Sequence, residues 1–174
     1  MLERTGLVKF GGKDVTVVGD DVKVGQQAPE FHVHSLTWEW QPMLETTKGK
    51  VRIISAVLSL ETSVCDRETR RFNEEAASLS QDIAIIVVSA DLPYTQKRWC
   101  GGAGIDQVMV VSDHREMEFG VKYGCLLKEP RILRRAVFVV DRSDKVVYAA
   151  YMAALGDEPD YETVLASARN ALKG

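Results

Sequence analysis

The sequence has few of the residues that build disulfide scaffolds and zinc sites. Among 174 residues there are three cysteines, Cys65, Cys100 and Cys125, and an odd number leaves at least one unpaired. They form no Cys-x-x-Cys pair, and the three histidines do not combine with them at zinc-binding spacing. We therefore expect no disulfide framework, no structural metal and no cofactor. Such cysteines in a reducing compartment are either small buried hydrophobes or redox-active groups.

Long apolar runs and an excess of positive charge are also missing. No apolar run reaches the ~18 residues that a membrane span requires, and the polar N-terminal segment lacks the apolar stretch of a secretory signal. The net charge is −3, from 22 Lys and Arg against 25 Asp and Glu, which argues against a nucleic-acid partner. We expect a cytoplasmic protein that contacts neither membrane nor nucleic acid, with residues 1–174 forming a single domain.

From residue 51 onward the sequence alternates between strand-like and helix-like patterns. Val51–Leu58 and Ile83–Ser89 are apolar runs typical of strands buried on both faces. Residues 66–80 carry apolar side chains at helical spacing, with Ser63 predicted as the cap. A short helix over 94–100 is expected to stop at Gly101-Gly102. It is followed by a strand over 108–112 and a helix over 116–123.

A β-hairpin is predicted at the start of the chain and another before its last helix. Residues 7–10 and 15–18 flank a turn, giving an N-terminal β-hairpin extension over 1–20. Residues 31–36 are predicted as a short strand and 38–50 as irregular. A second hairpin pairs 136–140 with 145–151, and a helix follows from Pro159-Asp160. Because consecutive βα units place strands in parallel, we expect an α/β fold with a mixed central sheet flanked by helices, in thioredoxin-like topology.

Cys65 is the main candidate for a reactive group. It follows Thr62-Ser63-Val64 at the junction between a predicted strand and a predicted helix, where free backbone N–H groups and the helix dipole favour a thiolate. The alternative is a buried cysteine that fills space. No histidine lies near it in sequence to act as a base. This favours an electrophile that needs no proton abstraction, such as a peroxide O–O bond, and the first product is then a sulfenic acid.

Candidate partners for this thiol lie far along the chain. Arginine suits a thiolate because it stays charged and offers directed donors. Three arginines, Arg131, Arg134 and Arg135, precede a predicted strand. Composition does not distinguish among them, and by itself it predicts a solvated basic cluster. Cys100 either resolves a sulfenic acid by forming a disulfide or packs beside Trp99. Cys125 is expected to pack against the core.

Four segments resemble those of bacterial thiol peroxidases, the atypical two-cysteine peroxiredoxins, and the likeness covers nearly the whole chain. The segments are Leu60–Asn73, Ser89–Gly101, Arg135–Asp141 and Glu158–Tyr161. The resemblance implies a thioredoxin-like fold with an added N-terminal hairpin, a homodimer, thioredoxin as reductant, and hydrogen peroxide and organic hydroperoxides as substrates. A peroxide-sensing thiol switch with weak turnover is the alternative function.

The resemblance also implies roles for individual residues. Cys65 matches the peroxidatic cysteine, and Thr62 matches the hydroxyl that bonds thiolate and peroxide. Arg135 matches the arginine that activates both, and Cys100 the resolving cysteine. One departure is Leu58, which stands where the family has a proline that shields the cysteine and fixes its loop. Leu58 either covers the sulfur as another apolar group or leaves the pocket looser. Cys125 replaces a usual aliphatic residue.

Overall fold

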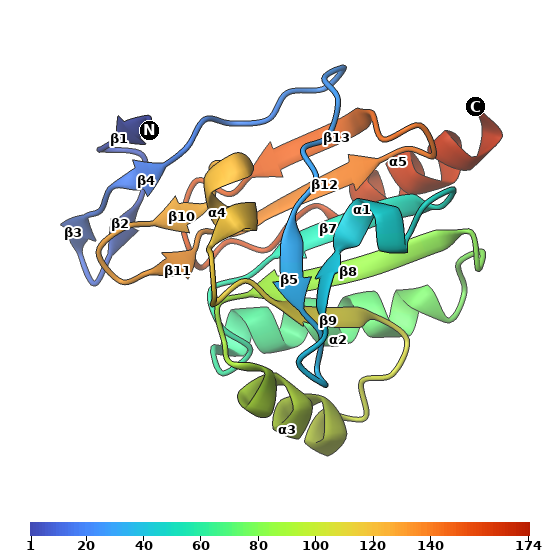
Figure 1. Ribbon diagram of the computed structural model, residues 1–174, viewed down its shortest axis with the longest axis horizontal. Coiled ribbons are helices and arrows are strands. Elements are labelled where there is room, and N and C mark those ends of the chain that lie inside the picture. The colour runs from blue at the N-terminus through green and yellow to red at the C-terminus, as the bar shows by residue number, and fades with distance from the viewer.

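A seven-stranded mixed sheet forms the centre of the computed structural model, which describes residues 1–174 (Figure 1). The three central strands β7, β8 and β9 run parallel, as the βα pattern predicts, and the outer strands pair antiparallel. The strand order is β13 (Val146–Tyr151), β12 (Ala136–Val140), β7 (Val51–Ala56), β8 (Ile83–Ser89), β9 (Met109–Ser112), β5 (His32–His34) and β6 (Trp40–Pro42).

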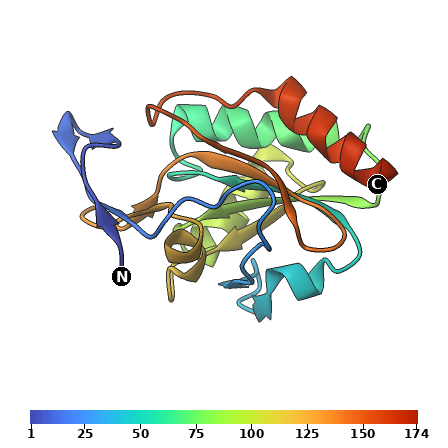
Figure 2. The same cartoon turned by 90° about the horizontal axis from the view of Figure 1, so that it is seen from above.

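Helices cover both faces of this sheet, as Figure 2 shows. The long helices α2 (Ser63–Ala76) and α5 (Tyr161–Lys173) lie side by side on one face, and α1 (Met43–Thr46) and α4 (Glu118–Lys122) lie on the other. Helix α3 (Pro93–Ala103) lies beside β9. Each face has its own apolar core: Phe72, Val164 and Leu165 pack under α2 and α5, whereas Phe31, Phe119 and Phe138 pack on the opposite face.

The N-terminal hairpin is shorter than predicted. Strand β2 (Lys9–Phe10) pairs with β3 (Lys13–Asp14) around Gly11-Gly12, whose positive φ angles a tight hairpin turn requires. The predicted second arm is partly wrong, because β4 (Val17–Val18) pairs with other strands. It belongs to a separate four-stranded sheet of order β1 (Glu3–Arg4), β4, β10 (Leu126–Leu127) and β11 (Ile132–Leu133). The sequence pattern did not indicate β10 and β11.

Two other expectations are corrected. Residues 38–50 are not irregular, because they contain β6 and α1. Helix α3 does not stop at Gly101-Gly102 but runs through both glycines to Ala103. Gly104 ends it instead, in the left-handed conformation (φ 69°) that a helix C-cap favours. Packing of the α3 side chains Gln96 and Cys100 overrides the weak helix propensity of the glycines.

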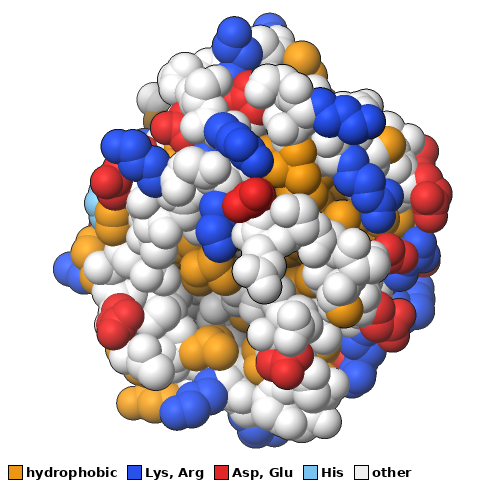
Figure 3. All heavy atoms as spheres, turned by 90° about the vertical axis from the view of Figure 1, so that its right-hand side faces the viewer, with side chains coloured by type: hydrophobic (Ala, Val, Ile, Leu, Met, Phe, Trp, Pro, Cys, Tyr) orange, Lys and Arg blue, Asp and Glu red, His pale blue; other side chains and the backbone are white.

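The surface mixes both signs of charge. On the face shown in Figure 3, lysine and arginine side chains alternate with aspartate and glutamate, and patches of apolar atoms lie between them. No helix has both the length and the apolar character needed to cross a bilayer.

Candidate active site

Cys65 lies in the first turn of α2, directly after the loop that leaves β7. Thr62 is the N-cap of this helix: its backbone is extended, and its side-chain oxygen accepts a hydrogen bond from the Cys65 amide at 3.3 Å. The prediction of Ser63 as the cap is therefore wrong, since Ser63 is already helical. The Thr62 hydroxyl donates to the Ser59 carbonyl at 3.2 Å. The Cys65 side chain is fully buried.

The loop before Thr62 is held by Asp91, which follows the neighbouring strand β8. One Asp91 oxygen accepts from the Ser59 hydroxyl at 2.7 Å, and the other accepts from the Leu60 amide at 2.9 Å. Leu58 is 8% exposed and packs in the same apolar cluster as Cys65. An aspartate just after the neighbouring strand thus fixes this loop, and Leu58 occupies the family's proline position as a buried apolar group.

Arg135 reaches Cys65 from the start of β12. Ala136 pairs with Ala56, so the register of β12 places Arg135 beside the end of β7. Its Nη2 donates to the Cys65 sulfur at 3.2 Å and to the Leu155 carbonyl at 3.1 Å. Arg135 is 1% exposed, which corrects the expectation of a solvated basic cluster. Arg134 is also buried but bonds Asp21 and the Gly124 carbonyl, and Arg131 is exposed.

The side chain that the sequence reading missed is Glu68. It stands three residues after Cys65 and therefore on the same side of α2. Its Oε2 accepts from Arg135 Nη1 at 2.6 Å, and its Oε1 accepts from the Ser55 hydroxyl at 2.7 Å. Burial raises the pKa of the Glu68 carboxyl, although Arg135 and Ser55 act in the opposite direction. The i, i+3 spacing from Cys65 is the one signal that could have identified it.

Cys100 lies in the third turn of α3 and belongs to the same buried apolar cluster as Cys65. Burial raises the pKa of the Cys100 thiol to about 11, so the side chain is protonated at neutral pH. Both cysteines are free thiols in this structure.

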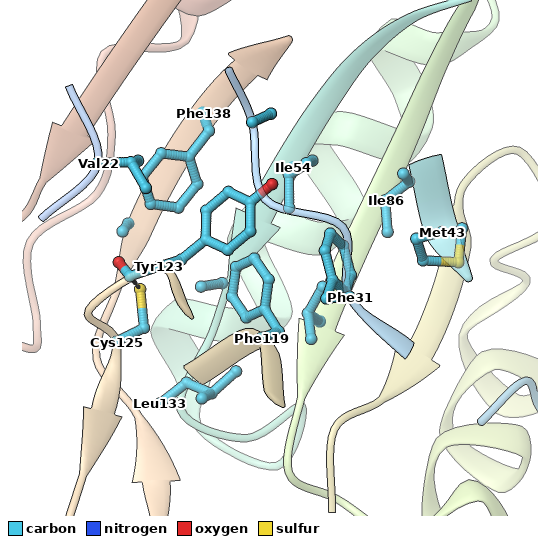
Figure 4. Close-up of a cluster of buried hydrophobic side chains, with 14 of the residues drawn as sticks. Val22, Phe31, Met43, Ile54, Ile86, Phe119, Tyr123, Cys125, Leu133 and Phe138 are labelled. Carbon is cyan, nitrogen blue, oxygen red and sulfur yellow. Dashed lines mark hydrogen bonds between the residues drawn. The ribbon is translucent and has the colours of Figure 1, made fainter. Parts of the chain in front are cut away.

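Cys125 packs against the core, as predicted, in a different cluster from Cys65 and Cys100. Figure 4 shows it in the aromatic core with Phe119 and Tyr123, where its thiol donates to the Tyr123 carbonyl at 3.5 Å. Burial raises the pKa of the Cys125 thiol to about 12, which makes the group a poor nucleophile. Cys125 therefore functions as a core residue.

The geometry around Cys65 suits a nucleophile that needs no general base. A guanidinium donates to the sulfur, the cysteine lies in the first turn of a helix, and no histidine hydrogen-bonds to Cys65, Thr62, Arg135 or Glu68. Such a site on a thioredoxin-like sheet defines a cysteine-dependent redox protein.

The comparisons with known proteins agree with this class. Residues 23–165 match the Redoxin family model. The chain is 49% identical over 166 residues to the thiol peroxidase of Bacillus subtilis (strain 168), covering 95% of this chain and 98% of that one. The thiol peroxidase of Halalkalibacterium halodurans is 46% identical over 166 residues, with the same coverage.

A solved structure, that of a peroxiredoxin-like protein from Aquifex aeolicus, has a TM-score of 0.85 at 36% identity and covers 97% of both chains. The chain belongs to the Redoxin family and, within it, to the thiol peroxidases. The prediction of a thioredoxin-like fold is confirmed.

Proposed function

We propose that this thiol peroxidase reduces hydrogen peroxide and organic hydroperoxides through a Cys65 sulfenic acid and a Cys65–Cys100 disulfide, with thioredoxin as the reductant. The observation that carries the proposal is the hydrogen bond from Arg135 to the Cys65 sulfur, 3.2 Å long and fully buried. A charged donor in that position stabilises a thiolate over a thiol.

In the first step the Cys65 thiolate attacks the terminal peroxide oxygen. The S–O bond forms as the O–O bond breaks, sulfur is oxidised, and the departing oxygen takes a proton and leaves as water or an alcohol. Arg135 stabilises the negative charge that moves from sulfur to the leaving oxygen. The Thr62 hydroxyl, which caps the helix beside Cys65, rotates to bond the bound peroxide.

In the second step Cys100 attacks the oxidised sulfur. An S–S bond forms, the S–O bond breaks, and hydroxide leaves as water with the proton of the Cys100 thiol. An external dithiol, which we assign to thioredoxin, then attacks the bridge by thiol–disulfide exchange and returns both cysteines to the reduced state. We further propose that the protein acts as a homodimer in the cytoplasm.

A coupled assay tests this sequence of steps. Hydroperoxide consumption is measured with thioredoxin and its reductase for the wild type and for Cys65→Ser, Cys100→Ser and Cys125→Ser. We expect Cys65→Ser to abolish turnover, Cys100→Ser to slow it severely and Cys125→Ser to preserve it. Undiminished turnover in Cys65→Ser would refute the mechanism. A wild type that is oxidised once per molecule without further turnover would instead indicate a peroxide-sensing thiol switch.

A further inference from the structure

A side-chain hydrogen bond ties the two cysteine-bearing helices together. The indole Nε1 of Trp99 donates to Asp66 Oδ1 at 3.0 Å. Asp66 directly follows Cys65, and Trp99 directly precedes Cys100. Both side chains are half-buried, so water competes only partly for this bond. The bond therefore links the residue after Cys65 to the residue before Cys100.

Arg70 reinforces this contact from the next turn of α2. Its Nε donates to the second Asp66 oxygen at 2.8 Å, and its guanidinium lies 5.7 Å from the centre of the Trp99 ring. Asp66 is therefore oriented by one partner on its own helix while it accepts from the indole on the other.

Helix α3 has little stability of its own. Gly101 and Gly102 lie inside it, and glycine is the poorest helix former after proline. Neither glycine is required sterically, since a Cβ added at either position meets nothing within 4 Å and neither has a positive φ. The N-cap, Leu92, makes no side-chain capping bond. The position of α3 therefore depends on contacts with its neighbours, and Trp99–Asp66 is a directional one among them.

We propose that the Trp99–Asp66 hydrogen bond is a latch that holds α3 against α2 in the reduced protein and must open before Cys100 can reach Cys65. This inference rests on the proposed function. Forming an S–S bond of about 2.05 Å moves Cys100 relative to Cys65, and Trp99 moves with it, so the latch and the disulfide compete. Opening also releases the Cys100 thiol from the burial that keeps it protonated.

The latch sets how long the Cys65 sulfenic acid survives. While α3 is closed, a second hydroperoxide can oxidise the sulfenic acid to a sulfinic acid, giving up one oxygen and leaving as water or an alcohol. When α3 opens, the disulfide forms instead. Asp66 and Trp99 are thus positioning residues that control the ratio of disulfide to sulfinic acid.

Rapid-quench mass spectrometry after mixing reduced protein with hydrogen peroxide separates the steps. For Trp99→Phe, which keeps an aromatic ring but loses the donor, we expect disulfide formation to be about tenfold faster, with a smaller sulfinic fraction. For Gly101→Ala or Gly102→Ala, which strengthen α3, we expect it to be about fivefold slower, with more sulfinic acid. The rate of sulfenic acid formation stays that of the wild type in all three.

Glu61→Gln is the matched control. The Glu61–Arg98 pair also links the α2 loop to α3, at 2.8 Å, but both side chains are largely exposed. An exposed ion pair contributes little, so this variant should leave the disulfide rate within about twofold of the wild type. A large effect of Glu61→Gln would show that any α2–α3 contact acts alike and would overturn the specific role of Trp99–Asp66.

A double-mutant cycle tests the same bond from both ends. If Asp66→Ala and Trp99→Phe act through one hydrogen bond, the double variant is no faster than either single variant, whereas independent effects multiply. Asp66→Ala alone also tests the latch if Trp99→Phe does not fold. Unchanged or slower disulfide formation in these variants overturns the latch alone. A wild type that forms no Cys65–Cys100 disulfide overturns the proposed function, and the latch with it.

Discussion

Arg135 and Cys65 are 70 residues apart in the chain, and Arg135 Nη2 lies 3.2 Å from the Cys65 sulfur. The antiparallel pairing of β12 with β7 produces this contact, since Ala136 faces Ala56 at the end of β7 where the Cys65 loop begins. The relationship rests on sheet register, so it is as rigid as the central sheet itself.

Arg135→Lys should slow oxidation of Cys65 by at least about tenfold. A single ammonium cannot replace the planar guanidinium that bonds Cys65, Glu68 and the Leu155 carbonyl at once. Stopped-flow measurement of thiol oxidation by hydrogen peroxide gives the rate, and circular dichroism checks the fold. A rate within twofold of the wild type would show that positive charge alone is sufficient.

Glu68 is expected to affect the oxidation of Cys65 by positioning the Arg135 guanidinium. In Glu68→Gln the amide oxygen still accepts from Arg135 and the amide nitrogen can donate to Ser55, so oxidation of Cys65 should stay within about threefold of the wild type. Glu68→Ala leaves a cavity and removes the only carboxylate that orients the Arg135 guanidinium, and the rate should fall about tenfold. The same stopped-flow assay compares the two variants. Equal rates for Ala and Gln would contradict a positioning role.

Leu58→Pro restores the family's residue and should change little. The Leu58 amide donates no hydrogen bond, so proline removes none, and Asp91 already fixes the following residues. We expect kcat/KM for hydrogen peroxide to stay within about threefold of the wild type, whereas Asp91→Ala should lower it about tenfold or more. A large gain in Leu58→Pro would mean that the present loop is loose.

Cys125→Ala should reduce stability and leave turnover intact. The thiol lies in the aromatic core, and its removal leaves a small cavity that costs about 1 kcal/mol of unfolding free energy. Urea denaturation measures this loss, and the coupled peroxidase assay measures turnover. Loss of turnover in this variant, together with unchanged turnover in Cys100→Ser, would reassign the resolving role to Cys125.

Asp113 should make stability depend on pH. Burial raises the pKa of its carboxyl to about 7, although the Gly120 and Phe119 amides that it accepts from act in the opposite direction. Between about pH 4 and 7 the folded protein keeps this proton while the unfolded chain has lost it. Stability therefore falls as pH rises through this window, by up to about 1.4 kcal/mol per pH unit from this group.

Asp113→Asn, which has no titrating proton, is the control for that pH dependence. Urea midpoints measured at pH 5 and pH 8 should differ less in the variant than in the wild type. The variant is also expected to be less stable at pH 5, because one of the two amides loses its oxygen acceptor. An equal pH dependence in both proteins would place the titration elsewhere.

Local sequence patterns predicted the strands that are marked by an apolar run or by turn residues. Val51–Ala56, Ile83–Ser89 and the hairpin β12–β13 follow from apolar runs and turn residues. The two-residue strands β10 and β11 were missed because they are too short for a periodic pattern. Strand β10 pairs with β4 from the opposite end of the chain, which no local window records.

The site residues also divide into one that a local pattern predicts and others that depend on contacts between distant segments. The sequence located Cys65, because the start of a helix is a local feature. Arg135 had to be taken from the family resemblance, since its selection over Arg131 and Arg134 depends on the register of β12 against β7. Glu68 was missed because a charged residue is buried on the inner face of a helix only when a partner, here the distant Arg135, is present.

The pairing of β12 with β7 also determines when the thiol becomes reactive during synthesis. Cys65 leaves the ribosome 70 residues ahead of Arg135, which at ~5–20 residues per second is a delay of about 4–14 s. Throughout that interval the nascent chain carries the cysteine without the guanidinium that we propose activates it. On the proposed mechanism, the thiol of the nascent chain therefore reacts more slowly with peroxide until the sheet closes.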